Sequence, residues 1–260
     1  MKTYDWVLVL ETIAPPELAM KGDNVGLLIG TTRTEIKKVL VALDCTLDTA
    51  EEAAKWGADV LLTHHPILYD PVRRIDPYSP DTAGAYALIR AGVAHYAAHT
   101  NLDAAQMGVN DCLCERLKIY DAVPLPPENL GRLGVVSDGF TLETFAAFTE
   151  KELQTTIRFC GRPEAPVKKI AVIGGSGGSS IRDARLSGAD TFVTGELKHH
   201  QALEAVSLGL NVIEAGHYET ENVVLLPWIK RLQSLTDDVK YKLARSESAP
   251  LRGVSPTHRR

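Results

Sequence analysis

Short apolar runs of strand length alternate with stretches of helical periodicity through most of this sequence. The apolar runs cover residues 36–44, 58–66, 92–100, 167–175, 189–196 and 210–217. The stretches between them cover residues 46–58, 81–92, 179–188 and 199–209. This alternation is typical of βαβ units, in which a helix carries the chain back to the next parallel strand. We therefore expect an α/β fold built on largely parallel sheets.

The two halves of the chain resemble each other. Gly57-Ala58-Asp59 followed by Thr63 matches Gly188-Ala189-Asp190 followed by Thr194 at the same internal spacing. Chance similarity is the alternative, because short apolar strands look alike. We expect two related α/β domains made of βαβ-type halves, with a Pro-rich linker between them and a flexible tail that contains His258. The expected segments are 1–125 for the first domain, 126–245 for the second, 118–134 for the linker and 246–260 for the tail.

The charge of the chain argues against two classes of partner. Its 28 Lys and Arg against 33 Asp and Glu give a formal net charge of −5, whereas surfaces that bind nucleic acid or anionic lipid need a basic excess. No apolar run approaches the roughly 20 residues that span a bilayer. Residues 1–24 contain neither a basic leader nor an apolar signal core. We expect a cytoplasmic protein with no membrane partner, for which direct nucleic-acid binding is disfavoured.

The cysteines follow no zinc-finger or disulfide-framework spacing, which suits reduced thiols in a cytoplasm. They are Cys45, Cys112, Cys114 and Cys160. Cys112 and Cys114 have two interpretations, a metal-binding pair or two small apolar residues in a helix.

Histidines and acids collect just after the apolar runs. Ligands in open α/β sheets bind beyond the carboxyl ends of the strands, so the side chains at these ends are candidates for one site. They are His64, His65, His99, Asp103, Glu196, His217 and Glu221. The alternative is that each histidine is a hydrogen-bonded core or surface residue.

The adjacent histidines 64 and 65 predict a site for two metal ions. Pro66 favours extended backbone before it, so His64 and His65 diverge and suit two different ions. Glu221 lies four residues after His217, one helical turn away, and either Glu221 or Asp103 can bridge the ions. Imidazole and carboxylate ligands suit Zn²⁺, Fe²⁺, Mn²⁺ or Co²⁺. We expect this site at the strand ends between the two domains.

Other residues near these strand ends have two interpretations each. His99 can move a proton at neutral pH or orient Asp103. Glu196 and His200 lie four residues apart and can both face the site, although Glu196 also suits a helix N-terminus. The glycine-rich turn before residues 179–188 can cradle a phosphate through its N–H groups or form a plain tight turn. Its candidate binding residues are Gly174, Gly175, Ser176 and Gly177.

Together these motifs resemble a known family. THHP, HTNLD, the glycine-rich turn followed by TGE, and GHYETE look like those of the GTP cyclohydrolase 1 type 2 family, also called the NGG1-interacting-factor-three-like (Nif3-like) family, over residues 24–242. The resemblance implies a two-domain α/β fold, a toroidal homohexamer and two divalent metal ions per chain. It also implies one ion on His64 and Asp103, the other on His65 and His217, and Glu221 as the bridge.

Two features depart from the family pattern. Gly22 precedes Asp23 where members usually have Trp, and the chain lacks the large domain that some members carry between the halves. The leading functional hypothesis is a metal-dependent hydrolase in which a metal-activated water attacks a small molecule such as a nucleotide, with His99, Glu196 or His200 moving the proton. The alternative is a non-catalytic metal-binding oligomer that serves as a scaffold or a regulatory interaction protein. Rossmann-type dinucleotide binding ranks third, because its glycine spacing is missing.

Overall fold

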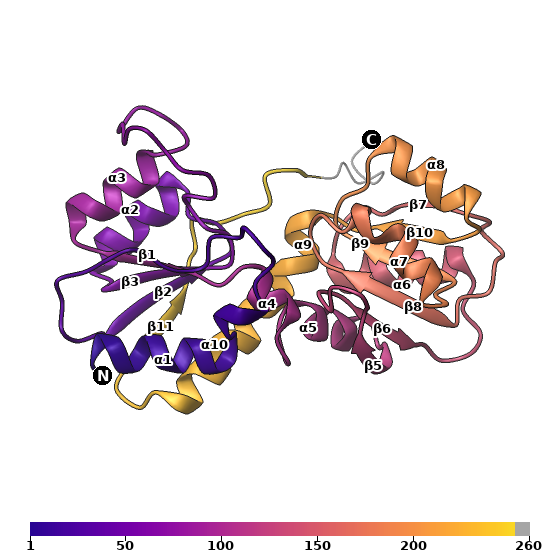
Figure 1. Cartoon of the computed structure of the whole chain (residues 1–260), viewed down its shortest axis with the longest axis horizontal. Coiled ribbons are helices and arrows are strands. Elements are labelled where there is room, and N and C mark those ends of the chain that lie inside the picture. Colours follow the sequence, from indigo (N-terminus) through magenta and orange to yellow (C-terminus); the bar gives the residue numbers. More distant parts are fainter. Residues whose placement is uncertain (253–260) are drawn as a thin grey trace, which may run out of the picture. The chain divides into compact units, whose positions relative to one another are not determined.

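The computed structural model describes residues 1–252. Within this range the chain folds into two compact units, and each has its own mixed α/β sheet (Figure 1). Unit 1 consists of Met1–Gly108 together with Val224–Ser248, and unit 2 contains Val109–Val223. Among residues 1–252, no helix combines the length and the apolar character needed to cross a bilayer.

Unit 1 has a five-stranded sheet in the order β1-β4-β3-β2-β11. Strand β1 is antiparallel to β4, and the other neighbours are parallel. Figure 1 shows α2 and α3 on one face of this sheet and α1 and α10 on the other. The elements are α1 (Thr3–Ile13), η1 (Pro16–Leu18), β1 (Gly26–Ile29), β2 (Lys38–Ala42), α2 (Leu47–Trp56), β3 (Val60–Thr63), α3 (Ala83–Ala91), β4 (Ala94–Ala97), α4 (Thr100–Ala104), α10 (Leu225–Leu235) and β11 (Lys240–Leu243).

The strands of unit 1 are apolar throughout because both faces of the sheet are covered. On one face, Leu40 and Leu61 pack with small residues of α2 and α3 such as Ala53 and Ala85. Those alanines let the two helices lie close to the sheet. On strand β4, the Tyr96 ring meets the ring of Trp6 from α1 edge to face, with centroids 5.9 Å apart.

Unit 2 has a six-stranded sheet in the order β5-β6-β8-β9-β10-β7, in which β8, β9 and β10 are parallel. Residues of α5 and α6 form a core with one face of the sheet, and residues of α7 and α8 form a core with the other. The elements are α5 (Val109–Arg116), β5 (Tyr120–Pro124), β6 (Arg132–Val135), α6 (Leu142–Leu153), β7 (Arg158–Cys160), β8 (Lys169–Ile173), η2 (Gly178–Ser180), α7 (Ile181–Leu186), β9 (Thr191–Thr194), α8 (His199–Ser207), β10 (Asn211–Glu214), α9 (His217–Glu221) and η3 (Asn222–Val224).

The internal repeat extends to matching hydrogen bonds. In unit 1, Oδ2 of Asp59 accepts from the backbone N–H groups of Lys37 and Lys38 at 2.8 and 2.9 Å. In unit 2, Oδ2 of Asp190 accepts in the same way from residues 168 and 169 at 3.1 and 2.8 Å. Each carboxylate ties the start of one strand to the start of its parallel neighbour. The two α/β units are therefore related in detail as well as in outline.

The division of the chain differs from the predicted boundaries in three places. The Pro-rich segment 118–134 is no linker, because it contains edge strand β5 and the start of β6 within unit 2. The C-terminal segment returns to unit 1, where β11 pairs in parallel with β2. The predicted flexible tail is held at its start, where Glu52 accepts hydrogen bonds from the backbone of Arg245 and Ser246. His258 lies outside the described residues.

Candidate metal centre

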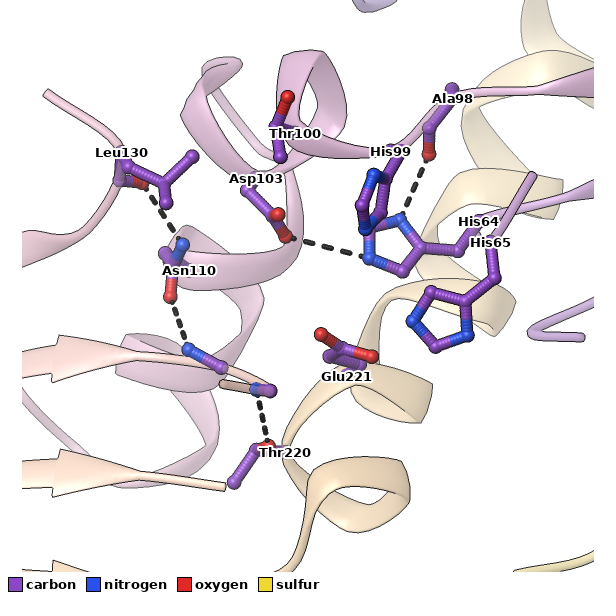
Figure 2. Close-up of polar contacts among 12 residues, drawn as sticks. His64, His65, Ala98, His99, Thr100, Asp103, Asn110, Leu130, Thr220 and Glu221 are labelled. Atoms are coloured by element: carbon purple, nitrogen blue, oxygen red, sulfur yellow. Dashed lines mark hydrogen bonds and ion pairs between the residues drawn. The ribbon is translucent and has the colours of Figure 1, made fainter. Parts of the chain in front are cut away.

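His64 follows the last residue of β3 and is fully buried. Its Nδ1 donates a hydrogen bond to the carbonyl oxygen of Ala98, 2.8 Å away. A carbonyl only accepts, so Nδ1 carries the proton, and Nε2 of the neutral ring presents a lone pair. That Nε2 lies 3.6 Å from Oδ1 of the buried Asp103 (Figure 2). In the neutral ring two acceptors therefore face each other, an arrangement that suits a cation between or beside them.

His65, the next residue, is oriented by an acid at the end of the neighbouring strand. Its Nδ1 donates to Oδ1 of Asp44 at 2.8 Å, and Asp44 lies just beyond β2. The His64 and His65 rings are tilted by 47° to each other with centroids 4.9 Å apart. A histidine that binds metal through one nitrogen commonly donates its other N–H to a carboxylate or carbonyl. Both rings are arranged in this way.

His99 follows β4 and completes a cluster of three imidazoles. Its Nδ1 donates to Oδ1 of Asp23 at 2.8 Å. Burial raises the pKa of Asp23, but hydrogen bonds from His99 and Thr100 outweigh it and hold the pKa well below its usual range. Asp23 therefore stays negatively charged beside His99. One ring nitrogen each of His64, His65 and His99 lies within 4.8 Å of the other two, so unit 1 contains a candidate metal-binding group.

Unit 2 carries a second group of donors at the start of α9. His217 donates from Nδ1 to Oε1 of Glu196 at 2.9 Å, and its Nε2 lies 3.0 Å from Oε2 of Glu221. Glu221 is one helical turn further along and nearly buried, with 4 % of its side chain exposed. This is again a ring whose Nδ1 is held by an acceptor and whose Nε2 faces a carboxylate. The predicted spacing of His217 and Glu221 on one helical face is present.

The glycine-rich loop after β8 lies against this pair. Its N–H groups are taken up inside unit 2, because Gly174 donates to Oδ1 of Asn110 at 2.9 Å and Gly175 donates to Oγ1 of Thr220 at 3.0 Å (Figure 2). A Cβ on Gly175 would lie 2.0 Å from Oε1 of Glu221. These contacts favour the tight-turn interpretation over the phosphate cradle: glycine lets the backbone approach the acid.

The remaining predicted residues of this loop agree with that interpretation. Gly177 donates its N–H to Oγ1 of Thr194 at 3.0 Å, which leaves that group unavailable to a phosphate. Ser176 is exposed on the loop. His200 is exposed on α8, and no hydrogen bond or ion pair joins it to Glu196, His217 or Glu221 within residues 1–252.

Two acids of the site were not recognised from the sequence. Asp44 ends the apolar run 36–44 in the same way that the histidines end theirs, so its position at a strand end was a usable signal. Asp23 does not follow an apolar run, and only its contact with His99, far along the chain, identifies its role. Cys112 and Cys114 are buried in α5, and burial raises the pKa of Cys112 to about 11 and of Cys114 to about 12. Protonated thiols favour the apolar-packing interpretation of this pair.

Comparison with known proteins decides the family. The sequence profile of the Duf34/NIF3 (NGG1p interacting factor 3) family matches residues 1–250. The chain belongs to the Duf34/NIF3 family. Among its relatives is a GTP cyclohydrolase 1 type 2 homolog from Clostridium perfringens, 33% identical over 96% of this chain and 98% of the relative. A homolog of the same name from Methanocaldococcus jannaschii is 38% identical over 85% of this chain and 90% of the relative.

A solved structure supports the same assignment. The crystal structure of a Bacillus cereus protein related to NIF3 superposes with a TM-score of 0.90 at 25% identity, covering 98% of this chain and 99% of that one. The resemblance predicted from THHP, HTNLD and GHYETE is therefore confirmed, and so is the α/β fold of this Duf34/NIF3 protein.

Proposed function

We propose that this protein is a dinuclear divalent-metal-dependent hydrolase that acts on a nucleotide or a related phosphorylated or heterocyclic small molecule. The observation that carries the proposal is the orientation of the rings. His64, His65 and His217 each donate from Nδ1 to a fixed acceptor, as metal-binding histidines commonly do, and all three belong to groups of side chains that could hold a metal ion. Relatives named GTP cyclohydrolase 1 type 2 homolog point to a nucleotide as the first substrate to test.

In this proposal His64 and Asp103 would hold one ion, His65 and His217 would hold the other, and Glu221 would bridge the two. The ligand set contains only imidazole and carboxylate, so it suits Zn²⁺, Fe²⁺, Mn²⁺ or Co²⁺. When bound, such a pair of ions lowers the pKa of coordinated water and polarises the bond to be hydrolysed.

His99 is the proposed proton carrier of the reaction. Its Nδ1–H is held by Asp23, so Nε2 can accept a proton from the attacking water and return it to the leaving group. The negative charge on Asp23 stabilises the imidazolium that forms, as an acid does behind a catalytic histidine. Glu196 is the second candidate for this role, but it is already the acceptor for His217. His200, exposed on α8, is the third.

The assembly and location of the protein are also proposals. The family resemblance supports a ring-shaped homohexamer, and the scattered cysteines suit a location in the cytoplasm. Edge strand β5 exposes Tyr120 and Val123, each with 52% of its surface accessible, so apolar surface is available for self-association. Light scattering of the purified protein distinguishes a hexamer from smaller species.

The test of activity compares metal-loaded protein with His65→Ala on GTP, other nucleotides and simple phosphoesters. The proposal predicts turnover by the wild type that is lost on chelation and reduced at least 100-fold in the variant. If the wild type hydrolyses none of these compounds and His65→Ala behaves identically, the hydrolase proposal is wrong. Thermal unfolding with and without chelator then tests the scaffold alternative, since a structural metal pair takes much of the stability with it.

A further inference from the structure

Behind the two adjacent histidines lies a buried polar pair that the proposed chemistry does not use. Thr63 ends β3 and His95 lies on β4, and both are fully buried. The Thr63 hydroxyl donates to the backbone carbonyl of His65 at 2.6 Å. The same hydroxyl oxygen lies 2.8 Å from Nε2 of His95. These two contacts connect the core of the sheet to the turn that carries His65.

The direction of these hydrogen bonds follows from counting protons. A hydroxyl has one proton, and the carbonyl of His65 can only accept it. The Thr63 oxygen is therefore an acceptor toward His95, which must carry its proton on Nε2. Burial lowers the pKa of His95 to about 3, so the ring is neutral at physiological pH.

Packing alone does not explain a histidine at position 95, because burying its polar ring destabilises the fold. Its Nδ1 is buried without a hydrogen-bond partner among the described residues, and a buried polar atom of that kind destabilises a fold. An aliphatic side chain of similar size would fill the space without this penalty. The contact with Thr63 is the feature that an aliphatic residue would lose.

At the related position in unit 2, the hydroxyl of another threonine makes a similar pair of hydrogen bonds. Thr194 ends β9 as Thr63 ends β3, and it donates to the carbonyl of Gly175 at 3.2 Å. It accepts from the backbone N–H of Gly177 at 3.0 Å. In both units the hydroxyl of a threonine at the end of a strand accepts one hydrogen bond. It donates another to a backbone carbonyl in a loop that carries candidate metal-site residues. In unit 1 the donor is the imidazole of His95.

We propose that His95 is a positioning residue: through the Thr63 hydroxyl it fixes the backbone of the turn that presents His64 and His65 to a divalent metal ion. The inference rests on the proposed function in one respect, that these histidines bind metal. His95 itself contacts neither metal nor substrate. Its effect is on how well the ligands are held before the metal arrives.

The test measures Co²⁺ affinity and the Co²⁺ absorption spectrum of the full-length protein. His95→Leu and Thr63→Val each remove one link while keeping similar volume, and we expect about 10-fold weaker binding and an altered spectrum. His95→Gln and Thr63→Ser keep a donor and a hydroxyl, and we expect binding within about 3-fold of the wild type. Thr149→Val is the matched control, because Thr149 is equally buried and its hydroxyl has no hydrogen-bond partner within residues 1–252.

Wild-type affinity and spectrum in both His95→Leu and Thr63→Val would overturn the inference. If His95→Leu does not fold, the comparison of Thr63→Val with Thr63→Ser decides. Nitrogen-15 NMR of the metal-free protein provides a readout independent of metal: we expect a neutral His95 with its proton on Nε2, and a proton on Nδ1 would also overturn the inference. A wild type that binds no divalent ion contradicts the proposed function instead, and the NMR result still decides whether His95 donates to Thr63.

Discussion

At the scale of single residues, the candidate centre is organised by what holds the far side of each imidazole. Ala98 fixes His64 through a carbonyl, Asp44 fixes His65, and Glu196 fixes His217. A ring held in this way loses little conformational freedom when it binds a metal ion. The acids and the carbonyl are therefore as much a part of the site as the histidines.

Asp44→Asn tests this role. The amide keeps the shape of the carboxylate but removes the charge that favours the Nδ1–H form of His65. We expect the affinity for Zn²⁺ or Co²⁺ to fall by about 10- to 100-fold, measured by competition with a chromophoric chelator. Asp48→Asn, on the exposed surface of α2, is the control. Equal affinity in Asp44→Asn and the wild type would contradict the proposed role of Asp44.

His95 gives a pH dependence of stability with a definite sign. Its pKa falls from 6.5 to about 3 on folding, so below pH 6.5 the unfolded chain binds a proton that the folded chain does not. The folded state therefore loses stability from this residue as the pH falls from 6.5 toward about 3. Urea unfolding of the metal-free protein measures the free energy of unfolding at pH 7 and at pH 5. We expect this free energy to fall less between the two pH values in His95→Gln than in the wild type. An equal fall in the free energy of unfolding in the two proteins would contradict the lowered pKa of His95.

At the scale of secondary-structure elements, the two sheets share a device that joins neighbouring parallel strands. Asp59 and Asp190 each accept two backbone N–H groups at the start of the preceding strand. We expect Asp59→Ala and Asp190→Ala each to lower the free energy of unfolding by about 1–3 kcal/mol, since both leave backbone donors without their acceptor. Urea unfolding measures this effect, with Glu164→Ala as the exposed control. Unchanged midpoints would show that water replaces the carboxylates at no cost.

The loop after β8 gives a second prediction at this scale. Gly175 has φ 61° and lies where a Cβ would meet Glu221, whereas Gly209 has φ 67° and a Cβ there would meet no heavy atom of residues 1–252 within 4 Å. Both Gly→Ala variants carry the backbone cost of about 1–2 kcal/mol, but only Gly175→Ala must also displace Glu221. We expect Gly175→Ala to weaken metal binding at least 10-fold and Gly209→Ala to leave it unchanged. Similar metal affinities in the two variants would show that the close contact between Gly175 and Glu221 does not matter for metal binding.

The sequence predicted the elements that depend on local pattern. Six apolar runs became strands within one or two residues of their centres, because a continuous apolar run reflects burial on both sheet faces. It did not predict that β11 pairs with β2, nor that Asp23 holds His99. Both are contacts between distant segments, and nothing in the residues near either partner encodes the other. The prediction that the Pro-rich segment 118–134 is a linker was wrong, because edge strands such as β5 tolerate proline.

At the scale of the whole molecule, each unit supplies part of the proposed ligand set. His64, His65 and Asp103 belong to unit 1, and His217 and Glu221 belong to unit 2. A metal ion that binds the folded chain and not the unfolded chain stabilises the fold. We expect chelation to lower the thermal midpoint of the wild type, and to lower it less in His65→Ala combined with His217→Ala, which keeps the ligands of one ion only. A chelator effect of equal size in the double variant would place the metal elsewhere.

The most direct measurement is the metal content of purified wild-type protein, loaded with Zn²⁺, Mn²⁺, Fe²⁺ or Co²⁺, dialysed and analysed by elemental mass spectrometry. We predict two divalent ions per chain, and at most one in the variant that lacks both His65 and His217, because His64 and Asp103 remain in it. A wild type that retains no ion after loading, or a double variant that still retains two, would contradict the proposal.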